Sequence, residues 1–134
     1  MLNARHLPVL MYHHVSRCPG LVTLSPETFC EQMKWLADNN WRTVTSAELE
    51  YFYQGGTLPR KSVMLTFDDG YLDNWLRAWP VLKEYNLHAH IFLITGLIGK
   101  GNVRSRQEQE YSHRDCERLI ADNRSDEVML RWSE

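Results

Sequence analysis

The segment Ser62–Tyr71 reads SVMLTFDDGY, and it decides how the chain is interpreted. It begins with an apolar run that has the length of a buried strand, and Asp68, Asp69 and Gly70 follow where that strand ends. In α/β proteins, catalytic residues gather just beyond the carboxyl ends of parallel strands. Asp-Asp-Gly also serves as an ordinary turn, because Asp and Gly are preferred turn residues. The sequence therefore indicates either an active site or a simple turn at this point.

Two neighbouring carboxylates repel each other if both are ionised in a partly dry pocket. Such a pair needs a cation or a shared proton. A divalent metal resolves the conflict, because one carboxylate becomes a ligand while the other stays free as a general base. Taken alone, the pair Asp68-Asp69 is compatible with metal-assisted hydrolysis and equally with a turn without function.

Strands and helices alternate along the chain, which predicts parallel βαβ units. A helix is expected after Ser25, and a second after the capping-box sequence that starts at Thr45. A third follows the aspartates as far as Pro80, where a kink or a restart is expected because proline lacks the N–H. The expected strands cover residues 8–13, 41–45, 62–67 and 88–94.

The aspartate motif closely resembles the first motif of the polysaccharide deacetylases, carbohydrate esterase family 4. Val9–Val15 (VLMYHHV) resembles the first strand of that family's exopolysaccharide branch, and Trp79–Ile94 resembles the helix and strand that follow the motif. The resemblance spans most of residues 8–99. It implies an α/β fold in which parallel βαβ units form part of a distorted (β/α) barrel of the glycoside hydrolase/deacetylase type, the NodB homology domain.

Carried over to this chain, the resemblance implies that Asp68 is the catalytic base and Asp69 a metal ligand. It also implies that His13 and Tyr71 line the active site or contact substrate. The expected cofactor is a divalent metal, by preference zinc. In the family the remaining ligands are two histidines in a His-Ser/Thr-x-x-x-His motif, which this sequence lacks, and Met129–Glu134 resembles the segment leading into it. The sequence therefore predicts a truncated amino-terminal portion with an incomplete metal site.

The function implied by the resemblance is hydrolysis of N-acetyl groups on a polysaccharide or oligosaccharide. The alternative is a non-catalytic truncated domain that binds glycan weakly or has a purely structural role. An unfinished barrel would expose a sheet edge, so self-association is expected. An aspartate-nucleophile phosphatase is disfavoured because such sites use Asp-x-Asp rather than Asp-Asp-Gly.

The chain has 134 residues, of which 43% are hydrophobic and 24% charged, as in ordinary globular proteins. We expect one partial domain over residues 1–134, with core units at 8–99 and an inserted polar loop or lid at 100–128. That insertion is expected to hold one short helix, Asp115–Ile120. A net charge of −2 argues against nucleic acid as a partner, since nucleic acid calls for a clustered basic face. No apolar stretch has the length of a membrane span or a secretory leader, so the default location is the cytoplasm, whereas the resemblance also allows the cell envelope.

The remaining histidines, tryptophans and cysteines are interpreted as structural. His14 is expected to start a loop, and His88 and His90 to be satisfied structural residues on one side of their strand. His6 and His113 are expected to be exposed, and Trp75 and Trp79 to pack in the core. The cysteines are expected to be reduced thiols: Cys18, Cys30 and Cys116.

Overall fold

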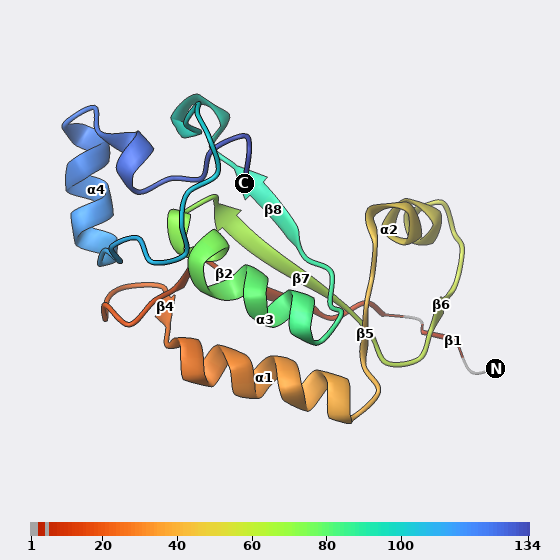
Figure 1. Cartoon of the computed structure of the whole chain (residues 1–134). Helices are drawn as coiled ribbons and strands as arrows, with labels where there is room; N and C mark the ends of the chain where they lie inside the picture. The colour runs from red at the N-terminus through yellow and green to blue at the C-terminus, as the bar shows by residue number, and fades with distance from the viewer. Residues whose placement is uncertain (1–2, 5) are drawn as a thin grey trace.

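The structure of the chain is a computed structural model that describes residues 3–4 and 6–134. At its centre lies strand β7 (Ser62–Asp69), which is parallel to all of its neighbours. Strand β2 (Val9–Tyr12) pairs with one edge of β7. The other edge pairs first with β5 (Arg42–Thr43) and then with β8 (His90–Leu93) (Figure 1). The prediction of parallel strands is confirmed.

Two helices, α1 (Pro26–Asp38) and α3 (Trp79–Glu84), lie side by side over one face of this sheet (Figure 1). Alternate residues of β7 point toward them, because side chains along a strand alternate between its two faces. The resulting core is formed by fully or nearly fully buried apolar residues, among them Phe29, Met33, Val63, Leu65 and Phe67. The predicted cap of α1 is confirmed, since the Ser25 side chain accepts the N–H of Thr28 at 3.1 Å.

Helix α2 (Ser46–Tyr53) begins with the predicted capping box between Thr45 and Glu48. Below it, β1 (Asn3–Ala4) and β6 (Leu58–Pro59) form a short antiparallel pair. A second short pair, this one parallel, joins β3 (His14–Val15) to β4 (Thr23–Leu24). The sequence did not predict these pairs, because two residues are too few to carry a periodic pattern.

The helical segment after the aspartates begins at Leu72, contains a π-helical turn, η1 (Asn74–Ala78), and passes directly into α3. Pro80 explains the wide turn. It has no N–H to donate to the carbonyl of Leu76, so the backbone there is free to take up one additional residue. Of the predicted kink or restart at the proline, the structure shows a restart, since α3 begins at Trp79 directly after the π-helical turn.

The last third of the chain folds back onto the end of the sheet. It contains η2 (Thr95–Leu97), α4 (His113–Ala121) and η3 (Ser125–Glu127), and α4 includes the helix predicted at Asp115–Ile120. The guanidinium of Arg104 fixes the connecting loop, because it donates to the Glu134 carboxylate at 2.7 Å and to the main-chain oxygens of Asp126 and Met129. The polar insertion is thus folded and anchored. Its action as a lid stays a prediction.

Helices long and apolar enough to cross a bilayer are absent from the part of the chain that the structure describes.

We expect Leu65→Ala to lower the free energy of unfolding by about 2–5 kcal/mol, because Leu65 is 0% exposed at the centre of β7 and its removal leaves a cavity. The matched control is Leu21→Ala, since Leu21 is 73% exposed and should change the same quantity by less than about 0.5 kcal/mol. Urea unfolding followed by circular dichroism measures both. Equal losses in the two variants would contradict the assignment of β7 to the core.

Candidate active site

Strand β7 extends through both acidic residues, two residues further than predicted. Asp68 lies opposite Phe92 of β8, and Asp69 lies opposite Leu93. The backbone then turns sharply, with φ of 74° at Asp69 and 83° at Gly70. Positive φ is uncommon for a residue other than glycine, and it concentrates at functional sites and turns.

Gly70 is required by both its backbone angle and its surroundings. A Cβ atom at this position would lie 2.6 Å from Cδ2 of Leu93 and 3.3 Å from Cδ1 of Ile98. The main-chain oxygen of Gly70 also accepts the N–H of Leu130 at 2.8 Å. The turn that carries the aspartates is therefore packed from two sides, and a larger residue would displace it.

His13 is the basic side chain that faces the aspartates. Its Nε2 lies 3.9 Å from Oδ2 of Asp68, which is too long for a hydrogen bond, and the two side chains are 21% and 32% exposed. Among the described residues, no lysine or arginine forms an ion pair with Asp68 or Asp69. The two carboxylates are thus partly open to solvent and are not consumed in structural ion pairs.

Tyr71 follows the turn and is 5% exposed. Burial, followed by the charge of Asp69 and a hydrogen bond to it, raises the pKa of the Tyr71 hydroxyl far above its usual value. The phenol therefore keeps its proton at neutral pH. The structure brings His13 next to Asp68 and Tyr71 next to Asp69, and all four are residues that the sequence singled out.

A buried polar network that the sequence did not predict lies directly behind these residues. The Asp73 carboxylate is 2.6 Å from Nδ1 of His14, and Nε2 of His14 is 3.0 Å from Nδ1 of His113. The ring of His14 stacks on Tyr71, with ring centroids 3.8 Å apart. The signal available in the sequence was the pair Asp73-Asn74, two polar residues inside an otherwise apolar helical stripe.

Several predictions about single residues were wrong. His14 is not a simple loop residue, since it is 1% exposed and bonded at both nitrogens. His113 is held at the start of α4 with its side chain only 17% exposed, because it packs against His14. His90 is not satisfied, since its buried Nδ1 has no partner among the described residues. Trp79 was expected in the core but is 42% exposed, while His6 is exposed as predicted.

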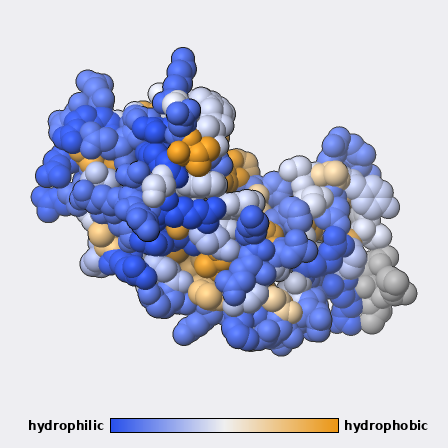
Figure 2. All heavy atoms as spheres, viewed as in Figure 1, coloured by the Kyte–Doolittle hydropathy of each residue, from blue (hydrophilic) through white to orange (hydrophobic). Residues whose placement is uncertain are grey.

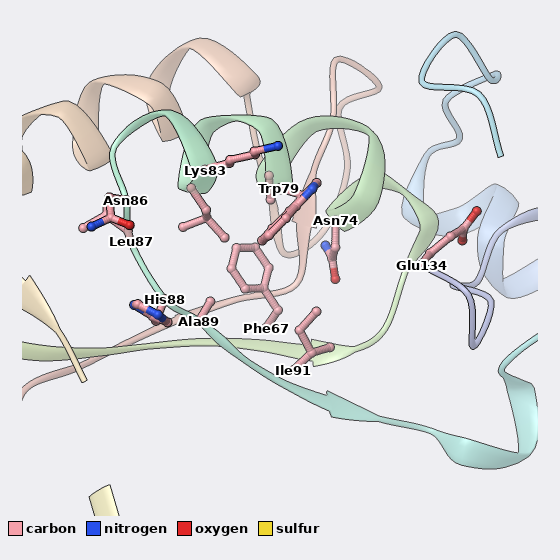
Figure 3. Close-up of a pocket in the computed structure, with 12 residues that line it drawn as sticks. Phe67, Asn74, Trp79, Lys83, Asn86, Leu87, His88, Ala89, Ile91 and Glu134 are labelled. Atoms are coloured by element: carbon pink, nitrogen blue, oxygen red, sulfur yellow. The ribbon is translucent and has the colours of Figure 1, made fainter. Parts of the chain in front are cut away.

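A hollow near the motif lies on the other face of β7. Figure 3 shows this cavity of about 370 Å³ between α3 and β8, with Phe67 and Leu82 at its wall and Asn74 and Glu134 at one end. Because neighbouring residues of a strand point to opposite faces, the cavity at Phe67 is separated by the sheet from the carboxylate of Asp68. It does not belong to the candidate active site.

A catalytic zinc centre commonly has three protein ligands and one open position. Over residues 3–4 and 6–134, no three histidine, cysteine, aspartate or glutamate side chains are grouped closely enough to hold an ion. Asp69 and Asp68 supply carboxylate oxygens, but the described residues do not fit a complete metal centre.

Comparison with known proteins agrees with the motif and the fold. Residues 55–118 match the family model described as polysaccharide deacetylase. The chain is 42% identical over 106 residues to a Bacillus subtilis protein named "Putative polysaccharide deacetylase YxkH". It is 35% identical over 83 residues to the poly-beta-1,6-N-acetyl-D-glucosamine N-deacetylase of Staphylococcus aureus. The chain belongs to the polysaccharide deacetylase family.

Solved structures of deacetylases have the same arrangement of elements. IcaB from Ammonifex degensii superposes with a TM-score of 0.64 and 30% identity, covering 87% of this chain and 49% of that one. The Streptococcus pyogenes deacetylase PplD, solved with acetate, gives 0.63 and 27%, covering 72% of this chain and 44% of that one. The matched regions are 78% and 62% of this chain, but only 38% of the Bacillus subtilis protein and 29% of the Staphylococcus aureus enzyme. This family member therefore spans less than half the length of these relatives.

Glu110 joins the insertion of this deacetylase-family chain to Ser16 and Arg17, which directly follow β3. Its carboxylate accepts the N–H of Arg17 at 2.9 Å and the hydroxyl of Ser16 at 3.2 Å, and it pairs with Arg77. Burial by itself would raise the pKa of Glu110. The Arg17 N–H, the Arg77 charge and the Ser16 hydroxyl outweigh burial and hold the pKa below its usual value.

A carboxyl whose pKa is lower in the folded state stabilises that state above its unfolded pKa, and this stabilisation is lost as pH falls through the folded value. We therefore expect Glu110→Gln to be less stable than the wild type at pH 7. The difference should shrink steadily as pH falls below about 4.3. Urea unfolding between pH 3 and 7 measures it. A difference that grows toward acid pH would contradict the role given to Glu110.

Proposed function

We propose that the chain is part of an enzyme that hydrolyses N-acetyl groups on a glycan. The observation that carries the proposal is the end of β7, where two partly exposed carboxylates have no lysine or arginine partner among the described residues and His13 lies 3.9 Å from Asp68. The name of the Staphylococcus aureus relative supports the choice of substrate class, a poly-N-acetylglucosamine.

In this proposal Asp68 is the general base. It accepts a proton from a water molecule, whose oxygen then attacks the acetyl carbon. The C–N bond breaks, the amine leaves with a proton, and acetate is released. His13 helps to orient Asp68, because its imidazole is the basic group closest to that carboxylate. Tyr71 keeps its proton beside Asp69, because burial and the charge of Asp69 raise the pKa of its hydroxyl.

We further propose that Asp69 is a ligand of a divalent metal ion, by preference zinc. A carboxylate combined with imidazole donors suits zinc, whereas carboxylates alone suit harder ions. The described residues supply too few donors to hold such an ion tightly on their own. A working metal centre would thus require ligands in addition to the residues grouped at the end of β7.

We propose further that the fold is part of a distorted (β/α) barrel. A barrel explains why one face of the sheet is apolar and exposed. Val9, Met11 and Phe92 are 54%, 63% and 57% exposed, and they lie on the side of the sheet opposite α1 and α3. The helix side is different. In Figure 2 it is mostly hydrophilic, with a hydrophobic patch beside the end of β8. In a barrel this exposed face would turn inward. In the second candidate, a non-catalytic domain, it would associate with another copy.

The catalytic proposal is tested by acetate release from an N-acetylglucosamine oligomer with added zinc. The assay uses the chain and, where its gene encodes residues beyond Glu134, also the longer gene product. We expect Asp69→Ala to lower the rate at least about 100-fold, because the ion loses a ligand. The control is Asp38→Asn, which removes an exposed carboxylate at the end of α1 and should leave the rate unchanged. Undiminished acetate release by Asp69→Ala would refute the ligand assignment.

The second candidate is tested by light scattering on the purified chain. If the face containing Val9, Met11 and Phe92 binds another copy, the mass should exceed that of one chain and should fall to it in Met11→Lys, because a buried unpaired charge opposes association. A monomer at all concentrations would argue against self-association through this face.

A further inference from the structure

Asp73 is buried at the base of the candidate active site, and over residues 3–4 and 6–134 it has no lysine or arginine partner. It is 6% exposed, and burial raises its pKa, although the bond to His14 opposes the shift. Its two oxygens receive three donors: Nδ1 of His14 at 2.6 Å, the Val15 N–H at 3.0 Å and Nδ2 of Asn74 at 3.0 Å. Removing a carboxylate from water costs several kcal/mol, so this site needs all three bonds to hold it.

These bonds fix the main chain around His13 from one side. The amide of Asn74 donates to the main-chain oxygen of His13 at 2.8 Å, while Asp73 holds the next two residues. On the other side, Tyr12 is paired with Phe67 in the parallel ladder between β2 and β7. His13 is therefore clamped between the sheet and the pair Asp73-Asn74, with its ring facing Asp68.

The same carboxylate acts on the second aspartate through an aromatic stack. Asp73 accepts from Nδ1 of His14, which fixes the orientation of that ring. The ring of His14 lies against Tyr71 at 3.8 Å with an angle of 28° between the planes, and Tyr71 neighbours Asp69. His113 contacts Tyr71 edge-on from α4, at 6.1 Å between centroids, so the phenol ring is held by two imidazoles.

We propose that Asp73 is a positioning residue for the deacetylase site and that it acts through two arms. The first arm is the main chain of residues 13–15, which sets His13 beside Asp68. The second arm is the His14 ring, which sets Tyr71 beside Asp69. The inference rests on the proposed function for its catalytic meaning. The clamp itself is a property of the folded chain and is measured separately. Neither Asp73 nor His14 contacts the reacting atoms in this proposal.

Nuclear magnetic resonance of the chain tests the clamp without any activity. In Asp73→Asn we expect the imidazole resonances of His13 and His14 and the ring resonances of Tyr71 all to shift. An amide has one oxygen and one NH₂ group, so it cannot accept hydrogen bonds on both sides as the two oxygens of the Asp73 carboxylate do. The control is Ser62→Ala, which removes another buried hydrogen bond, that of the Ser62 hydroxyl to Pro59, at the opposite end of β7. It should leave all three unmoved.

Two further variants separate the arms and serve if Asp73→Asn does not fold. Asn74→Ala removes the bond to the His13 oxygen and should shift His13 more than Tyr71. His14→Asn offers an amide N–H near the position of Nδ1 but no ring, so it should shift Tyr71 more than His13. Shifts of the same size at both residues in both variants, or no shifts, would overturn the two-arm clamp.

Kinetics of the longer, active version then test the catalytic meaning. Misplacing reacting groups by about 1 Å costs up to about 100-fold, so Asp73→Asn should lower kcat by about 10- to 100-fold with KM within about twofold. An unchanged kcat would overturn the positioning role. If the wild type releases no acetate, the proposed function fails, and the resonance shifts still decide whether the clamp exists.

Discussion

Strand β7 is hydrogen-bonded along both of its edges, and the arrangement of the chain depends on this constraint. Its buried residues supply the centre of the core, and its last two residues are Asp68 and Asp69. Because the pairing with β8 continues to Asp69, the acidic pair is part of the sheet rather than of a free loop. Groups that must keep a fixed geometry are best placed on such rigid elements.

Polar contacts connect the other segments to the end of β7, where Asp68 and Asp69 lie. Asp73 and Glu110 each accept several donors from the segment that follows His13, and Arg104 joins the insertion to Glu134. A buried polar group is costly unless it is fully bonded, so each contact requires its neighbours to be in place. The residues that surround the aspartates come from three distant parts of the sequence. Few alternative pairings would satisfy the hydrogen bonds of all these buried groups, and this makes the arrangement specific.

The sequence predicted the features that depend on residues close together in the chain and missed those that depend on residues far apart in it. The strand over Ser62–Phe67, the caps at Ser25 and Thr45 and the restart at Pro80 were predicted correctly, because each depends on residues close in the chain. The candidate pair Asp68-Asp69 was found for the same reason, with its catalytic and metal roles still predictions.

The contact between His14 and His113 was not predictable. These residues are 99 positions apart, and nothing in their neighbourhoods indicates that they meet. The left-handed backbone of Asp69 likewise follows from the packing of Leu93 and Leu130 around the next residue, which is tertiary information.

The π-helical turn at Asn74–Ala78 sets the rotational phase of the helix on either side of it. One additional residue in a turn offsets the following residues by about 100° relative to a regular helix. With this offset, Asp73 and Asn74 point toward the end of β2 while Leu82 of α3 still reaches the core. A single-residue deletion within this turn would leave the composition of the helix almost unchanged but would rotate its two ends relative to each other. Asp73 and Asn74 could then no longer reach the end of β2 while Leu82 packs in the core.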